Sequence, residues 1–186
     1  MATKAPVSLS SETEQQLMRE ALAEAERGMA EGEAPIGCVI ALPDTQTPGG
    51  AKIVARGHNK NNALQRKTAH AEIVAFENAG GKEGEKTLPA LPLDADDVIL
   101  VSSLEPCVMC LGAAMEAGVT HVLFGLKAPA DNGTTRVKPP ESPESSAPEI
   151  RGGILEDESR RLFERWLDQN KGTEQARFVE QLLALT

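Results

Sequence analysis

The sequence predicts an α/β fold in three layers, α/β/α, around a central mixed, mostly parallel five-stranded sheet. Short apolar runs typical of buried strands alternate along the chain with longer segments of helical periodicity. Two of these runs, 98–102 and 120–124, flank an apolar helical segment that follows Cys107, and such a strand, helix and strand form a parallel crossover unit. The 186 residues suffice for a single domain, expected over 10–186 after a loose tail at 1–9.

The first part of this domain is expected to hold one helix and two strands. Ser10 or Ser11 is a candidate cap for a helix that starts near Glu12. Leucine, methionine and alanine follow at helical spacing until glycines end the pattern. A turn rich in proline and glycine then connects two strands, expected over 36–42 and 52–56.

The rest of the chain is expected to complete the sheet and cover both of its faces with helices. The expected elements are a helix over 69–79 stopped by Gly80-Gly81, a strand over 98–102, the cysteine helix, a strand over 120–124, an irregular Pro-rich loop over 128–148, a short strand near 149–150, and helices over 156–169 and 174–183, the last within a C-terminal segment at 173–186.

Two short motifs carry the chemically active side chains: His70-Ala71-Glu72 and Pro106-Cys107-Val108-Met109-Cys110. Cysteines three residues apart in the first turn of a helix place both sulfurs on one side, where they can grip one ion. One histidine and two cysteines with an open fourth position bind zinc and acidify a water molecule. A histidine and a glutamate two apart point away from each other on a regular helix, so we expect His70 and Glu72 at the frayed start of theirs.

Two other interpretations of the cysteine pair stay open from the residues alone. A lone Cys-x-x-Cys is also typical of a redox pair or of half a structural zinc site. A structural site needs four protein ligands, and Cys38, His58 and His121 are the remaining candidates to complete one.

His-x-Glu followed by Pro-Cys-x-x-Cys resembles the signature of the zinc deaminases. On these motifs the chain is identified as a member of the cytidine deaminase superfamily over roughly residues 12–170, which implies a cytidine deaminase-like fold. The segments that resemble tRNA adenosine deaminases are Glu33–Gly37, Thr68–Ile73, Leu104–Ala113 and Gly153–Leu155, while Gly57-His58-Asn59 and Glu77–Gly80 are similar to fungal-type cytosine deaminases. Guanine deaminases share the same metal framework.

The resemblance implies a role for each matching residue. His70, Cys107 and Cys110 would hold one zinc ion per chain, and Glu72 would be the catalytic proton carrier. Asn59 matches the asparagine that contacts substrate, and the backbone around Ala71 would bind the substrate ring. Family members usually form dimers or larger oligomers, and the resemblance implies a homodimer.

The composition indicates a soluble cytoplasmic protein with no membrane partner. Three cysteines, two of them assigned to a metal, leave no disulfide framework. The N-terminal residues lack the apolar region of a signal peptide, and no apolar stretch approaches the ~20 residues that span a bilayer. The formal net charge of −9 is unlike the basic footprint that phosphate contacts favour.

The expected function is zinc-dependent hydrolysis of a ring amino group with release of ammonia. The resemblance favours adenosine-to-inosine deamination in tRNA, with an anticodon loop as substrate. The acidic charge and a C-terminal end, 178–186, that is not basic as it usually is in the tRNA enzymes favour the alternative, deamination of a free nucleobase or nucleoside such as cytosine or guanine. The Pro-rich loop 128–148 also lacks the sequence usual in the family. A non-catalytic zinc-stabilised binding module is the remote alternative.

Overall fold

The computed structural model describes residues 8–47, 49–79, 97–139, 141 and 146–186. Its elements are α1 (Ser11–Ala30), β1 (Gly37–Pro43), β2 (Ala51–His58), α2 (Ala71–Ala79), β3 (Ile99–Leu104), α3 (Val108–Glu116), β4 (His121–Leu126), β5 (Glu149–Arg151), α4 (Glu156–Asn170) and α5 (Glu174–Leu185). Most of the expected tail, the stop at Gly80-Gly81 and part of the Pro-rich loop lie outside the described residues.

The five strands form one mixed sheet in the order β2-β1-β3-β4-β5. β1 pairs antiparallel with both β2 and β3, whereas β3, β4 and β5 pair in parallel. Four strands therefore run in one direction and β1 alone runs against them, which confirms the expected mixed, mostly parallel sheet. The helix α3 connects two parallel neighbours, as the crossover pattern predicts.

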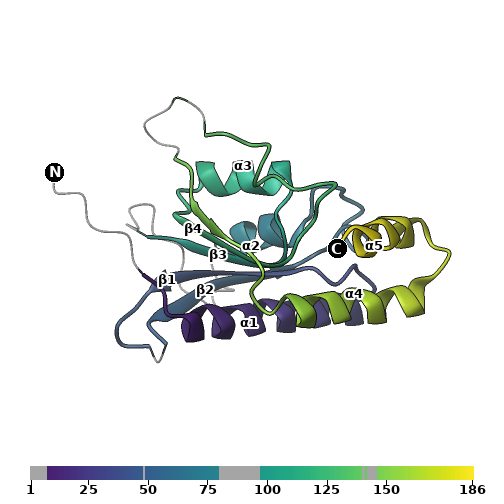
Figure 1. The fold of residues 1–186 in the computed structure, drawn as a ribbon, viewed down its shortest axis with the longest axis horizontal. Helices are drawn as coiled ribbons and strands as arrows, with labels where there is room; N and C mark the ends of the chain where they lie inside the picture. The colour runs from purple at the N-terminus through teal and green to yellow at the C-terminus, as the bar shows by residue number, and fades with distance from the viewer. Residues whose placement is uncertain (1–7, 48, 80–96, 140, 142–145) are drawn as a thin grey trace.

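Helices cover both faces of this sheet, so the three-layer arrangement is also confirmed (Figure 1). α2 and α3 lie on one face, over a core that includes Ile40, Leu100 and Leu111. α1 and α4 lie on the other face, over Val39 and Val101. α5 packs against α4 at the end of the sheet where β3 and β4 finish, around the buried Trp166.

The helix starts follow from local chemistry. Ser10 caps α1 because its side-chain oxygen accepts the backbone N–H of Thr13 at 3.1 Å. Thr173 caps α5 in the same way, through the N–H of Ala176. These contacts satisfy N–H groups that have no partner within their own helix.

The strand predicted to end at Arg56 continues to His58, and Gly57 explains what this extension does. Gly57 pairs with Cys38 of β1, so β2 stays in the sheet at this point. A side-chain carbon on Gly57 would lie 2.5 Å from the backbone oxygen of Ala71. Only glycine therefore lets the start of α2 lie directly on β2, and the His-x-Glu motif is placed by that close approach.

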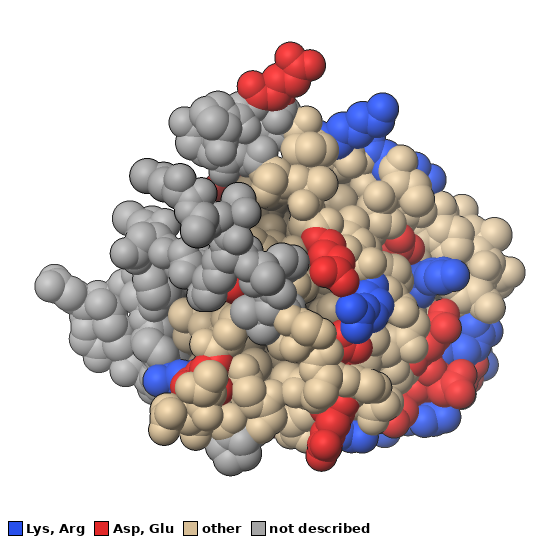
Figure 2. All heavy atoms as spheres, turned by 60° about the vertical axis from the view of Figure 1, so that its left-hand side comes forward, with Lys and Arg blue, Asp and Glu red and all other residues tan. Residues whose placement is uncertain are grey.

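The described surface carries charges of both signs. Acidic and basic side chains are intermingled on the face drawn in Figure 2 and form no continuous basic stripe there. Among the described residues, no helix combines the length and the apolar character needed to cross a membrane.

Candidate metal and active site

The structure brings His70, Cys107 and Cys110 together at the junctions where α2 and α3 begin. His70 Nδ1 lies 3.6 Å from each of the two sulfurs, and the sulfurs lie 3.6 Å apart. The three atoms form a nearly equilateral triangle, although 37 residues separate His70 from Cys107.

The triangle has the size that a zinc ion requires. Zinc–sulfur bonds of about 2.3 Å and zinc–nitrogen bonds of about 2.0–2.1 Å, at tetrahedral angles, separate two sulfurs by about 3.8 Å and a sulfur from a nitrogen by about 3.6 Å. The observed edges agree with these values to about 0.2 Å. The donor set of one imidazole and two thiols is also one that zinc prefers, so the residues fit one zinc per chain.

The fit leaves the fourth tetrahedral corner without a protein ligand. Within the described ranges, no further histidine, cysteine or carboxylate joins this cluster. Cys38 is buried in β1, His58 contacts Glu24 and Glu31, and His121 contacts Thr120. The three residues that could have completed a structural zinc site are therefore used elsewhere, and an open, catalytic type of site is favoured over a structural one.

Each ligand is positioned by the start of a helix. His70 directly precedes α2, as expected, and its carbonyl accepts the N–H of Val74. The same expectation is wrong for Glu72, which is the second residue of the helix, because α2 begins at Ala71. Cys107 is the cap residue of α3, and Cys110 lies three residues later on the same side. The partial positive charge at a helix start favours the thiolate form that zinc binds.

The thiols of Cys107 and Cys110 differ in pKa. The hydrogen bond with Cys110, opposed by burial and aided by the hydrogen bond with His70, lowers the pKa of Cys107 to about 4. The same contact with Cys107, together with burial, raises the pKa of Cys110. One sulfur of the pair is thus a ready anion, and the charge of a bound cation would deprotonate the second.

Glu72 lies on the first turn of α2 and is only 3% exposed. Burial raises the pKa of this carboxyl group. Its Oε1 accepts a hydrogen bond from Ser102 Oγ on β3 at 3.0 Å. A carboxylate whose pKa is shifted upward by burial suits a group that must both take and give protons near neutral pH.

Asn59 follows β2 and contacts the start of α2. Its Oδ1 accepts the backbone N–H of Ala71 at 2.9 Å, and it is 7% exposed. Among the described residues, its Nδ2 group donates no hydrogen bond within the structure. Asn59 therefore uses its acceptor to hold the His-x-Glu motif and keeps its donor available, while the roles of Asn59 and Ala71 toward substrate stay predictions.

Further hydrogen bonds fix Glu105 and Pro106, which directly precede the ligand Cys107, and the sequence does not reveal most of these contacts. Glu105 Oε2 accepts the N–H of Ala128 at 2.8 Å, and Glu105 Oε1 accepts the hydroxyl of Thr134. The N–H of Gly133 donates to the carbonyl of Pro106 at 2.7 Å. Thr134, Gly133 and Ser102 belong to no sequence motif; for Ser102 the available indication is a hydroxyl directly after three apolar residues in a strand.

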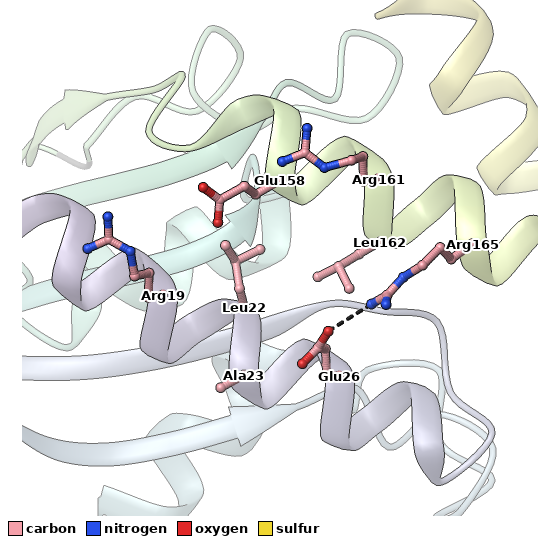
Figure 3. A pocket seen from close by; sticks show the side chains of 8 residues that line it. All are labelled: Arg19, Leu22, Ala23, Glu26, Glu158, Arg161, Leu162 and Arg165. Carbon is pink, nitrogen blue, oxygen red and sulfur yellow. Dashed lines mark hydrogen bonds and ion pairs between the residues drawn. The ribbon is translucent and has the colours of Figure 1, made fainter.

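The groove between α1 and α4 does not belong to this site. It measures about 400 Å³ and is lined by Arg19, Leu22, Ala23, Glu26, Glu158, Arg161, Leu162 and Arg165. Figure 3 shows these side chains on the two helices, with Arg165 paired to Glu26. Because α1 and α4 cover the sheet face opposite α2 and α3, the groove lies away from the metal triangle.

Residues 11–126 match the model of a family described as the cytidine and deoxycytidylate deaminase zinc-binding region. The matched range is more than half of the chain and includes His70, Glu72 and both clustered cysteines. The chain belongs to this family. The family match ends with β4, so β5, α4 and α5 lie beyond it.

Individual family members show the same relationship. A tRNA-specific adenosine deaminase from Streptococcus pyogenes serotype M18 is 38% identical over 120 residues, which are 64% of this chain and 65% of that protein. A tRNA-specific adenosine deaminase from Bacillus subtilis is 33% identical, and the alignment covers 76% of this chain and 80% of that protein. The chain thus spans just under two thirds of the streptococcal relatives.

A solved structure is similar as well. It comes from a study of A-to-I editing by tRNA:A34 deaminases at the wobble position of transfer RNA. The similarity has a TM-score of 0.58 at 28% identity, and it covers 79% of this chain and 98% of the other.

Proposed function

We propose that this protein is a zinc-dependent hydrolytic deaminase that converts adenosine to inosine in transfer RNA. The observation that carries the proposal is the zinc-sized triangle of His70, Cys107 and Cys110 beside the buried carboxylate of Glu72. The similarity to tRNA-specific adenosine deaminases supports the choice of substrate.

The chemistry is a hydrolysis in which water replaces a ring amino group. Zinc held by His70, Cys107 and Cys110 would lower the pKa of a water molecule from about 16 toward 7. Glu72 would take a proton from the attacking water and deliver it to the ring nitrogen next to the amino-bearing carbon, to which the water oxygen adds. Glu72 then takes the second proton and gives it to the amino group, so the carbon–nitrogen bond breaks, ammonia leaves and a carbonyl remains.

Asn59 and the start of α2 would hold the substrate during these steps. The Nδ2 group of Asn59 donates no hydrogen bond to another described residue and is a donor for a ring or ribose oxygen, since Oδ1 already accepts the N–H of Ala71. The backbone around Ala71 would line the ring, and its position is set by that same bond.

A free nucleobase or nucleoside is the second candidate substrate. The formal net charge of −9 favours it, because phosphate-rich partners are usually met by basic surfaces. Arg66, which lies between Asn59 and His70, is paired to Glu77 at 2.9 Å and so does not add a free cation there.

The cytoplasm is the proposed location, and a homodimer is the proposed assembly. Val108 of α3 is 48% exposed, and Gly112 and Ala113 on the same helix are half-buried small residues. An apolar, small-residue helix surface suits close packing against a second copy. Sedimentation of the wild type and of Val108→Asp tests this, since the charged variant should sediment as a monomer.

The substrate is decided by two assays run side by side on the zinc-loaded protein. One follows ammonia release from cytosine, guanine, adenine and their nucleosides, and the other follows inosine formation in an anticodon stem-loop by sequencing. Inosine without free-base turnover supports the proposal. Turnover of a free base or nucleoside alone would select the second candidate, and no reaction with any of them would reject both.

A further inference from the structure

We propose that Ser102 is a positioning residue for catalysis: its hydroxyl fixes the orientation of the Glu72 carboxylate and leaves one carboxylate oxygen free to move protons. The inference rests on the proposed function, because it assigns Ser102 a part in the same reaction. Its starting observation is the 3.0 Å hydrogen bond from Ser102 Oγ to Glu72 Oε1.

The strand pattern explains how Ser102 reaches the site. Side chains alternate between the two faces of a strand, so Ser102 shares a face with Leu100. Leu100 belongs to the core beneath α2 and α3, whereas Val101 belongs to the core on the α1 face. The hydroxyl of Ser102 therefore points into the layer that carries Glu72.

Packing alone does not account for a serine at this position. Ser102 is fully buried, and it follows Ile99, Leu100 and Val101 in a strand where apolar residues pack best. A buried hydroxyl without a partner costs free energy, so its presence calls for an acceptor. The buried carboxylate of Glu72 is that acceptor.

The strand that carries Ser102 is a rigid support. β3 is the middle strand of the sheet, and Ser102 faces Cys38 of β1 on one side and Phe124 of β4 on the other. A hydroxyl donor on a strand that pairs with neighbours on both sides can hold a flexible glutamate in one rotamer. Proton transfer depends strongly on the alignment of the carboxylate that such a rotamer fixes. With Oε1 held by Ser102, we assign the proton exchange to Oε2.

Ser103 supplies a matched comparison on the same strand. It is also fully buried, but its Oγ accepts the N–H of Gly37 at 3.0 Å and does not contact Glu72. Ser103→Ala therefore removes an equally buried hydroxyl without changing the support of the carboxylate.

The test compares Ser102→Ala, Ser102→Thr and Ser103→Ala with the wild type by kcat, KM, zinc content and thermal unfolding. Ser102→Ala should lower kcat by about 10-fold or more with KM and zinc content unchanged, because only the alignment of the proton carrier is lost. Ser102→Thr keeps the hydroxyl and should retain kcat within about 3-fold, and Ser103→Ala should keep wild-type kcat even if it unfolds earlier.

Crystal structures of zinc-loaded wild type and Ser102→Ala give a readout that does not depend on activity. The inference expects one Glu72 rotamer in the wild type and a shifted or divided side chain in Ser102→Ala. An unchanged rotamer, or a kcat for Ser102→Ala equal to that of Ser103→Ala, overturns it. If the wild type deaminates nothing, the proposed function fails, and the rotamer comparison still decides whether Ser102 positions Glu72.

Discussion

Asn59 Oδ1 accepts a hydrogen bond from the backbone N–H of Ala71 at 2.9 Å, and this hydrogen bond connects the residue after β2 to the first residue of α2. His70 and Glu72 flank Ala71, so the bond sets the position of the proposed metal ligand and of the proposed proton carrier together. Asn59 thus has a structural role, holding the start of α2, that is separate from its predicted contact with substrate.

The two tasks of Asn59 can be separated by mutation. Asn59→Asp keeps an acceptor for the Ala71 N–H but loses the Nδ2 donor, so it should fold and yet lower kcat/KM. Asn59→Ala loses both and leaves a buried N–H unpaired, which should reduce the free energy of unfolding by about 1–3 kcal/mol. Urea denaturation and steady-state kinetics measure the two effects, and full activity in Asn59→Asp would exclude the substrate contact.

Glu72→Gln should bind zinc normally and lose nearly all turnover. The amide keeps the size of the carboxylate but cannot accept and return a proton, so we expect kcat to fall by about 10²–10⁴-fold or more. Elemental analysis and a deamination assay check both parts. Glu77→Gln changes an exposed glutamate of the same helix and serves as control; equal rates in the two variants would refute the mechanism.

Removal of the metal should abolish activity and lower thermal stability. A chelator-treated sample should recover with zinc and not with magnesium, because thiolate and imidazole ligands favour zinc. Cys107→Ser should reproduce the loss, by about 100-fold or more in metal affinity or activity. Cys38→Ala, at the cysteine outside the cluster, should keep its zinc; a variant of Cys107 that still holds zinc tightly contradicts the assigned ligand set.

His58 should make stability depend on pH. The hydrogen bond to Glu24 raises the pKa of His58, and the contact with Glu31 raises it further. Burial and the charge of Lys60 lower this pKa, but the net shift is upward. Burial raises the pKa of Glu24, but the net shift is downward because the pKa is lowered by His58, Arg27 and Arg56.

The sign of the effect follows from these directions. The contribution of His58 is fully present below its unfolded pKa of about 6.5 and is lost as pH rises through the higher folded value. The contribution of Glu24 is present above about pH 4.5 and is lost as pH falls through its lower folded value. His58→Gln should therefore be destabilised most between these limits, by about 1.5–3 kcal/mol, and less as pH rises through the folded pKa of His58. Unfolding curves from pH 4 to 9 measure this, and a pH-independent difference would show that the charge of His58 contributes nothing.

Local pattern was sufficient for much of the fold. Ser10 caps α1 as expected, the apolar runs became the strands of a mixed sheet, and α3 crosses between two parallel strands. These features depend on neighbours within a few residues, or on a connection rule that most chains obey. The prediction that β2 ends at residue 56 is wrong, because its continuation to His58 depends on pairing with β1, which no local pattern reveals.

The sequence by itself determined the donor types and the spacing of Cys107 and Cys110, because one helical turn dictates where those sulfurs point. Only the tertiary structure decided that His70 completes the triangle while His58 and His121 do not, and that Ser102, 30 residues from Glu72, holds its carboxylate. Those choices depend on strand register and on the close approach of α2 to Gly57, which bring together residues that the chain keeps far apart.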